Sequence, residues 1–146
     1  MRMSEQRPVS AAPDELDRRV AHEFTRLTER SAANEDLTHR GRFLTTECLV
    51  GPFAAPIHLS IVSGRIVAAA PEPALMRSWR FAFRATSEAW AEFWEPIPRA
   101  GWHDLLALTK RGAAVLEGDL HPFLANLQFF KDLLAMPRGR FGGEAS

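Results

Sequence analysis

Residues 81–94 read FAFRATSEAWAEFW, and the spacing of the apolar residues changes within this stretch. Before Thr86, aromatic residues alternate with small or charged ones, which is typical of a strand with one face toward a core. After Thr86 the aromatic residues follow helical spacing, and Thr86 or Ser87 can cap this helix by accepting a backbone N–H. The stretch therefore predicts a strand over about residues 78–85 that leads into a capped helix, with its aromatic residues facing inward.

Three further strands are predicted upstream. Residues 42–50, RFLTTECLV, are β-prone, and residues 57–63, IHLSIVS, alternate apolar with other positions after a Gly- and Pro-containing breaker. Ser63-Gly64 is a plausible tight turn into residues 65–70, after which prolines stop the pairing. The economical interpretation is a meander of short antiparallel strands.

Helices are predicted before and after these strands. An amphipathic helix spans residues 14–34, and a shorter one spans residues 102–110. A last strand over residues 113–116 precedes a final apolar helix, which opens at His121-Pro122, where a first-turn proline costs no hydrogen bond. The order of elements predicts an α+β fold with about five mostly antiparallel strands, covered on one face by helices.

One domain is expected from the length of 146 residues. Pro, Ser and Gly at the ends indicate flexible tails over residues 1–13 and 137–146, leaving a domain over residues 14–136. The 18 basic residues are matched by 18 acidic ones, so the charge does not suggest a nucleic-acid partner. Neither a secretory signal nor a transmembrane segment is recognisable, and a cytoplasmic location is expected.

No motif predicts chemistry, a cofactor or a metal. The histidines form no HxH or HExxH cluster, and the glycines form neither a P-loop nor a GxGxxG turn. His103 and Asp104 are consecutive, so on a helix they do not face each other as a base and its orienting carboxylate would. Cys48, the only cysteine, is expected to be a buried and inert thiol.

The aromatic residues are the remaining signal, with ten Phe, four Trp and no Tyr. A well-filled core accounts for any single one of them. Taken together, Trp90, Phe93 and Trp94 on one helix and Phe129 and Phe130 on another put apolar groups on more than one helix face. Those faces either meet a partner or line a cavity.

Two segments resemble the sterol carrier protein type 2 (SCP-2) family of lipid-binding domains. Residues 81–90, FAFRATSEAW, resemble the family's strand leading into a capped helix. Residues 111–120, RGAAVLEGDL, resemble its short strand between glycines, followed by Gly-Asp before the last helix. Gly112 and Gly118 allow the turns, and Asp119 can cap the helix that follows. The resemblance implies lipid carriage without covalent chemistry.

The leading prediction is therefore a non-enzymatic domain that holds a lipid or another apolar small molecule in a hydrophobic pocket. One alternative is a homodimeric or partner-binding domain with a filled core and exposed aromatics. A small enzyme with an enclosed cavity, of the kind seen in cone-shaped α+β isomerases, is a further one. The residues predicted to line the pocket are Phe81, Phe83, Trp90, Phe93, Trp94, Leu105, Phe123, Leu127 and Phe130.

Overall fold

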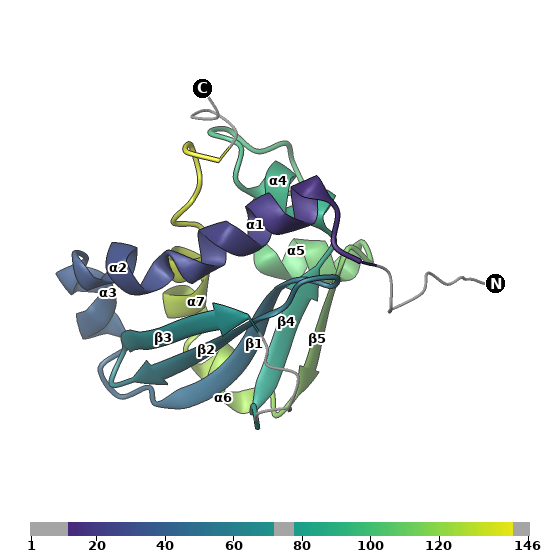
Figure 1. The fold of residues 1–146 in the computed structure, drawn as a ribbon. Helices are drawn as coiled ribbons and strands as arrows, with labels where there is room; N and C mark the ends of the chain where they lie inside the picture. The colour runs from purple at the N-terminus through teal and green to yellow at the C-terminus, as the bar shows by residue number, and fades with distance from the viewer. Residues whose placement is uncertain (1–11, 72–77, 142–146) are drawn as a thin grey trace.

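Five strands form one mixed sheet in a computed structural model that describes residues 12–71 and 78–141. Their order is β3-β2-β1-β4-β5 (Figure 1), with β1 and β4 parallel and the other neighbours antiparallel. The strands are β1 (Thr46–Pro52), β2 (Ile57–Val62), β3 (Arg65–Pro71), β4 (Phe81–Ala85) and β5 (Ala114–Gly118). The predicted mostly antiparallel sheet is confirmed. The parallel β1–β4 pair departs from a simple meander.

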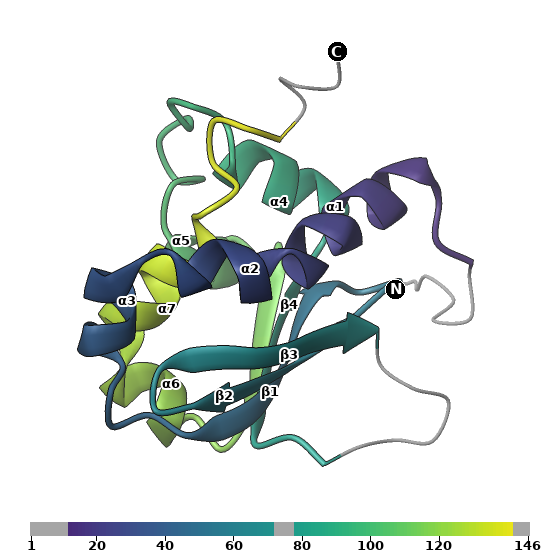
Figure 2. The ribbon, with the colours of Figure 1, turned by 60° about the vertical axis from the view of Figure 1, so that its left-hand side comes forward.

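Helices cover one face of this sheet, as predicted. They are α1 (Glu15–Thr25), α2 (Leu27–Ala32), α3 (Glu35–Arg40), α4 (Ser87–Phe93), α5 (Leu105–Lys110), α6 (His121–Ala125) and α7 (Leu127–Leu134). Figures 1 and 2 show α1, α2, α4, α5 and α7 on the same side of the strands. The fold is thus an α+β arrangement of a helical layer on a sheet.

The helical region at the N-terminus is more divided than the sequence predicts. The expected single helix over residues 14–34 is interrupted at Arg26, whose amide donates to the Glu23 carbonyl oxygen in a tightened turn. A further helix, α3, was not expected, because its only apolar residue is Leu37. Asn34 starts it by accepting a hydrogen bond from the Leu37 amide at 3.0 Å.

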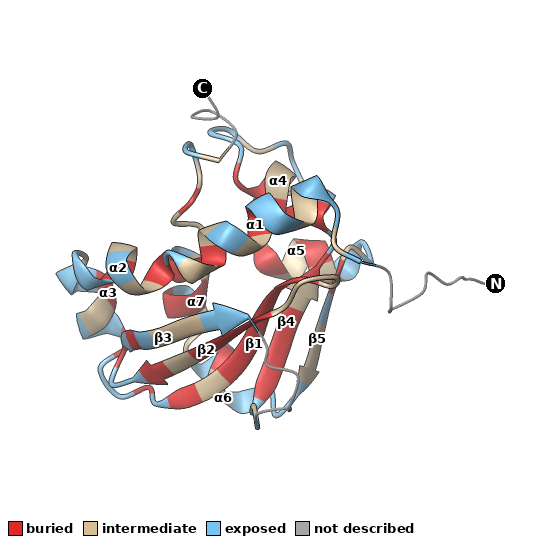
Figure 3. Ribbon diagram, viewed as in Figure 1, coloured by how far each residue is buried: buried red, intermediate tan, exposed pale blue. Residues whose placement is uncertain are grey.

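The core lies between the sheet and the helices. Cys48 and Val50 of β1 lie opposite Phe81 and Phe83 of β4, and Leu59 of β2 extends the same face. All five side chains are buried, and Figure 3 shows the buried residues gathered on the central strands and on the inner faces of the helices. The predicted inward face of the aromatic strand is confirmed.

The predicted junction between the strand and the helix is also confirmed. Thr86 is the cap of α4, and its hydroxyl accepts a hydrogen bond from the Ala89 amide at 3.0 Å. Gly118 has φ +98°, and a Cβ there would lie 2.6 Å from the Arg80 carbonyl oxygen, so this turn requires glycine. Asp119 accepts a hydrogen bond from the His121 amide at 3.2 Å, but the N-cap of α6 is Leu120, so Asp119 lies one residue before the capping position that the sequence predicted for it.

The described residues beyond α7 make contacts with the rest of the domain. Residues 137–141, which the sequence assigned to a flexible tail, pack against α4. The Gly139 amide donates to the Trp94 carbonyl oxygen at 2.9 Å, and the Phe141 ring lies 5.2 Å from the Trp94 ring. Packing of the Phe141 ring and the hydrogen bond from Gly139 offset the conformational entropy that this glycine-containing segment loses when it is ordered. Residues 1–11 and 142–146 lie outside the described residues.

Candidate ligand-binding site

The residues predicted to line a pocket lie together in the interior. Eight of the nine are buried, and Leu127 is half-buried. Phe81, Phe83 and Phe130 surround Phe123, whose ring lies between 5.4 and 5.7 Å from each of theirs. Such separations are normal for packed aromatic pairs. Whether a ligand enters between these rings stays a prediction.

A second group of rings is centred on Trp90. Its ring lies 5.8 Å from Phe83, 5.8 Å from Phe93 and 5.5 Å from Trp94. The three aromatic residues of the α4 segment are at most 2% exposed. The alternative of a partner-binding surface built from Trp90, Phe93 and Trp94 therefore loses the residues on which it depended.

Phe24 of α1 completes this group and was not among the predicted site residues. Its ring lies 4.8 Å from Trp90, nearly perpendicular to it, and 5.3 Å from Trp94. The signal was available, because Val20, Phe24 and Leu27 share the apolar face of the N-terminal helical region. What the spacing could not show is that this face meets α4.

A pocket of about 470 Å³ lies beside this interior, between α1, the turn from β1 to β2 and the end of β3. That volume is within the range of small-molecule sites. Apart from Arg18, His22 and Thr25, its lining is apolar: Pro13, Ala21, Ala54, Ala55, Pro56, Ile57 and Pro71. None of the nine predicted residues is in this lining.

Small side chains and prolines leave the space for this pocket. Ala21 presents only a methyl group from α1, and Ala54 and Ala55 do the same from the turn. Gly51, with φ +106°, supplies the backbone conformation at the end of β1 that an L side chain rarely adopts. In the sequence Gly51, Ala54 and Ala55 belong to GPFAAP, residues 51–56, which signals a break between strands and does not indicate which helix will face it.

Phe24 lies between the pocket and the interior. A Cβ built on Gly51 would lie 3.6 Å from Phe24 Cδ2 and equally far from the Ala55 oxygen and the Ile57 nitrogen, which belong to two lining residues. The same Phe24 ring contacts Trp90 on its other side. Phe24 thus contacts the aromatic core and lies near the backbone of two residues that line the pocket.

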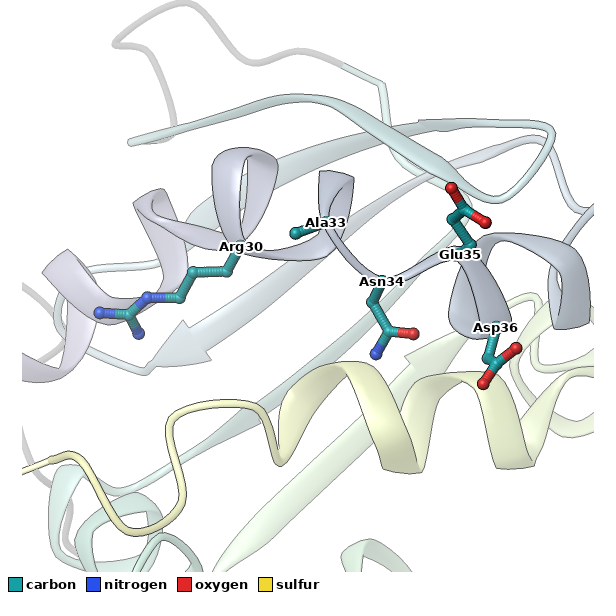
Figure 4. A pocket seen from close by; sticks show the side chains of 5 residues that line it. All are labelled: Arg30, Ala33, Asn34, Glu35 and Asp36. Carbon is teal, nitrogen blue, oxygen red and sulfur yellow. The ribbon is translucent and has the colours of Figure 1, made fainter.

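A second pocket, of about 510 Å³, is polar and lies where α2 meets α3 (Figure 4). Its lining is Arg30, Ala33, Asn34, Glu35 and Asp36. Arg30 is already paired with Glu23, and the Asn34 side chain caps α3. This pocket does not match an apolar ligand.

Polar contacts link His58, Ser60 and Glu47. His58 Nε2 lies 3.2 Å from Glu47 Oε1, and the Ser60 hydroxyl donates to that same oxygen at 2.7 Å. Both residues therefore bind one carboxylate, an arrangement in which His58 does not activate Ser60 as a nucleophile. Within residues 12–71 and 78–141, no group of three or more His, Cys, Asp or Glu could hold a metal ion.

Cys48 is buried, as expected, but Asp104 is not on a helix, because α5 begins at Leu105 and not at Trp102 as the sequence predicted. Asp104 caps α5 by accepting from the Leu106 and Ala107 amides, and it also pairs with Lys131 at 2.9 Å. Burial raises the pKa of the Cys48 thiol far above its usual range, with a smaller contribution from the charge of Glu47. A thiol buried in this way stays protonated near neutral pH and is not activated as a nucleophile.

Comparison with known proteins identifies the fold. No family model matches the chain, and no curated protein matches its sequence. A crystal structure of sterol carrier protein 2 superposes with a TM-score of 0.60 and 16% identity, covering 82% of this chain and 93% of that one.

Two further solved structures superpose less closely. A Thermus thermophilus protein, possibly a sterol carrier protein, has 16% identity and a TM-score of 0.49, with 86% and 89% of the two chains covered. The UbiJ-SCP2 ubiquinone synthesis protein has 17% identity and the same TM-score, with 80% and 85% covered. In the described part of the chain, no helix is long and apolar enough to cross a membrane.

Proposed function

We propose that this chain, which has the SCP-2-like fold, binds a lipid-like or other apolar small molecule and carries out no covalent chemistry on it. The observation that supports this most directly is the apolar pocket between α1 and the β1–β2 turn. A ligand there would be held mainly by burial of its hydrocarbon, worth about 0.8 kcal/mol for each methylene. Such a site needs no catalytic residues.

The pocket is the proposed entrance, and the aromatic interior is the proposed destination of the longer part of the ligand. Ile57 lines the pocket and is itself 1% exposed, so the floor of the pocket belongs to the core. The interior beyond Phe24 contains the rings predicted to contact the ligand. Because these rings are packed at separations of 4.8 to 5.8 Å, entry of a ligand chain would require them to move apart.

Native mass spectrometry of the protein purified from cells, followed by organic extraction, tests the proposal directly. We expect a bound apolar molecule, or saturable binding of at least one added fatty acid, sterol or prenyl lipid. Absence of a copurifying molecule together with no saturable binding of any of the three would contradict the proposal.

A matched pair of variants tests the location. Ala21→Phe places a ring in the pocket from α1, and we expect it to weaken binding of a fluorescent fatty acid by about tenfold or more. Ala32→Phe adds the same ring at an exposed position of α2 and should leave binding unchanged. Equal affinities for both variants would place the site elsewhere.

A further inference from the structure

The indole N–H of Trp90 is a buried donor without an acceptor. Among the described residues, three buried side-chain polar atoms have no hydrogen-bond partner: Thr46 Oγ1, Arg84 Nε and Trp90 Nε1. Arg84 still reaches Glu117 through another nitrogen, whereas Nε1 is the only polar atom of the Trp90 side chain. Leaving such a donor unpaired in a core is costly, and native proteins rarely keep one without a reason.

The neighbouring Trp94 shows that a buried indole N–H in this segment can find a hydrogen-bond acceptor within the protein. Trp94 is equally buried, and its Nε1 donates to the Leu134 carbonyl oxygen at 2.8 Å. The two rings lie 5.5 Å apart on the same segment. In a core that uses phenylalanine at most of its aromatic positions, a tryptophan at 90 supplies one property that phenylalanine lacks, a hydrogen-bond donor.

The position of Trp90 connects this donor with the pocket. Phe24 contacts the Trp90 ring at 4.8 Å and reaches Gly51, next to Ala55 and Ile57 of the pocket lining. Phe24 is therefore the side chain whose movement would have to open a route from the pocket to Trp90. The Arg138 guanidinium lies 4.7 Å from the centre of the Phe93 ring, but it donates to the Phe93 and His103 carbonyl oxygens. A neutral acceptor therefore suits the Trp90 donor better than a carboxylate, whose burial without a dedicated cation is expensive.

We propose that Trp90 is the polar anchor of the ligand site, and that the ligand is an apolar molecule with a neutral oxygen acceptor, such as a ketone, quinone or alcohol, admitted by movement of Phe24. This inference rests on the proposed function. The hydrocarbon supplies affinity, and the single hydrogen bond fixes which end of the ligand enters and selects for the oxygen.

The test compares two probes and two variants. The probes are a medium-chain methyl ketone and the alkane with the same number of carbon atoms. The wild-type protein should bind the ketone more tightly, and only the ketone should shift the Trp90 Nε1–H resonance in a ¹H–¹⁵N spectrum. Trp90→Phe should weaken ketone binding about three- to tenfold and leave alkane binding nearly unchanged.

Trp102→Phe is the matched control, because it removes an indole that is half-buried between Arg99 and Arg111 and is not among the predicted ligand contacts. It should preserve the preference for the ketone. Equal loss of preference in both variants, or a wild-type protein that binds ketone and alkane alike with no shift of the Trp90 signal, overturns the inference while leaving apolar binding intact. Failure to bind either probe, or any other apolar molecule, overturns the proposed function instead.

Phe24→Leu tests the route with a smaller side chain at the boundary. We expect the ketone to associate faster with this variant than with the wild-type protein, because the leucine side chain is smaller than the phenylalanine ring that it replaces. Leu37→Val shortens a buried side chain on α3, which does not line the pocket, and should leave the association rate unchanged. Unchanged association in Phe24→Leu would contradict entry past this residue.

Discussion

Gly41 and Gly64 pack backbone against backbone, joining the loop before β1 to the turn between β2 and β3. A Cβ on Gly64 would lie 2.7 Å from the Gly41 carbonyl oxygen and 2.6 Å from that of Thr38. Gly64 also has φ +81°, a conformation that other residues adopt only at a cost. The sequence marked the turn at Gly64, but nothing in it identified the partner backbone.

Gly64→Ala is expected to destabilise the domain by about 2 kcal/mol or more, since it adds steric overlap to backbone strain. Gly112→Ala separates the two effects. Gly112 has nearly the same φ, +79°, with nothing within 4 Å of the added methyl group, so about 1 kcal/mol should be lost. Denaturant unfolding of both variants measures the difference, and equal losses would contradict the close approach.

Trp94→Phe should lower the free energy of unfolding by about 1–3 kcal/mol, because the Leu134 carbonyl oxygen loses its buried donor. Trp102→Phe is the comparison. Its ring is half-buried between Arg99 and Arg111, and the same substitution there should cost less than about 1 kcal/mol. Thermal and chemical unfolding report both values, and a larger loss at Trp102 would be inconsistent with the Trp94 bond.

Ser87 and Asp17 join the first turn of α4 to the first turn of α1. The Ser87 hydroxyl donates to Asp17, whose carboxylate also closes the capping box with Asp14. A double-mutant cycle with Ser87→Ala and Asp17→Ala should give a coupling free energy of about 0.5–2 kcal/mol. Ser31→Ala, which removes another buried hydroxyl, should show no coupling to Asp17→Ala.

The buried Cys48 thiol is expected to make the free energy of unfolding depend on pH in the alkaline range. Since burial raises its pKa in the folded state, the unfolded thiol ionises first, above about pH 8.5, and the unfolded state then binds fewer protons. The free energy of unfolding should fall as pH rises, by up to about 1.4 kcal/mol for each unit. The chain contains no tyrosine, so no phenol titrates in the same range.

Cys48→Ala should remove this slope between about pH 8.5 and 10, whatever it does to stability at neutral pH. Unfolding titrations at several pH values provide the measurement. An identical slope in the variant and the wild-type protein would show that Cys48 is not protected by burial.

The sequence predicted helices and strands well where the spacing of apolar residues and a helix-capping residue indicated the same boundary. The alternation before Thr86 and the helical spacing after it correctly gave β4 and α4, and the glycines around β5 gave its turns. The pattern failed where a single contact decides the outcome. Leu37 alone does not produce a visible helical period, and Phe141 beyond a Gly-containing segment gives no sign that it reaches Trp94.

The candidate site was predictable only in part, for the same reason. Aromatic residues identified the interior, because large apolar side chains are conspicuous in a sequence. The pocket exists because Ala21, Ala54 and Ala55 have no side-chain atoms beyond Cβ that would fill it. Small residues acquire that meaning only when the fold brings two segments opposite each other.

The parallel pairing of β1 with β4 has a kinetic consequence. The strands β1, β2 and β3 are joined by short turns and can pair through local contacts, whereas the pairing of Cys48 with Phe81 joins segments that β2 and β3 separate in the sequence. Bringing β1 and β4 together costs loop-closure entropy before their contacts can stabilise the pair. The pairing of β4 beside β1, and not the formation of any helix, is therefore the step expected to limit the folding rate.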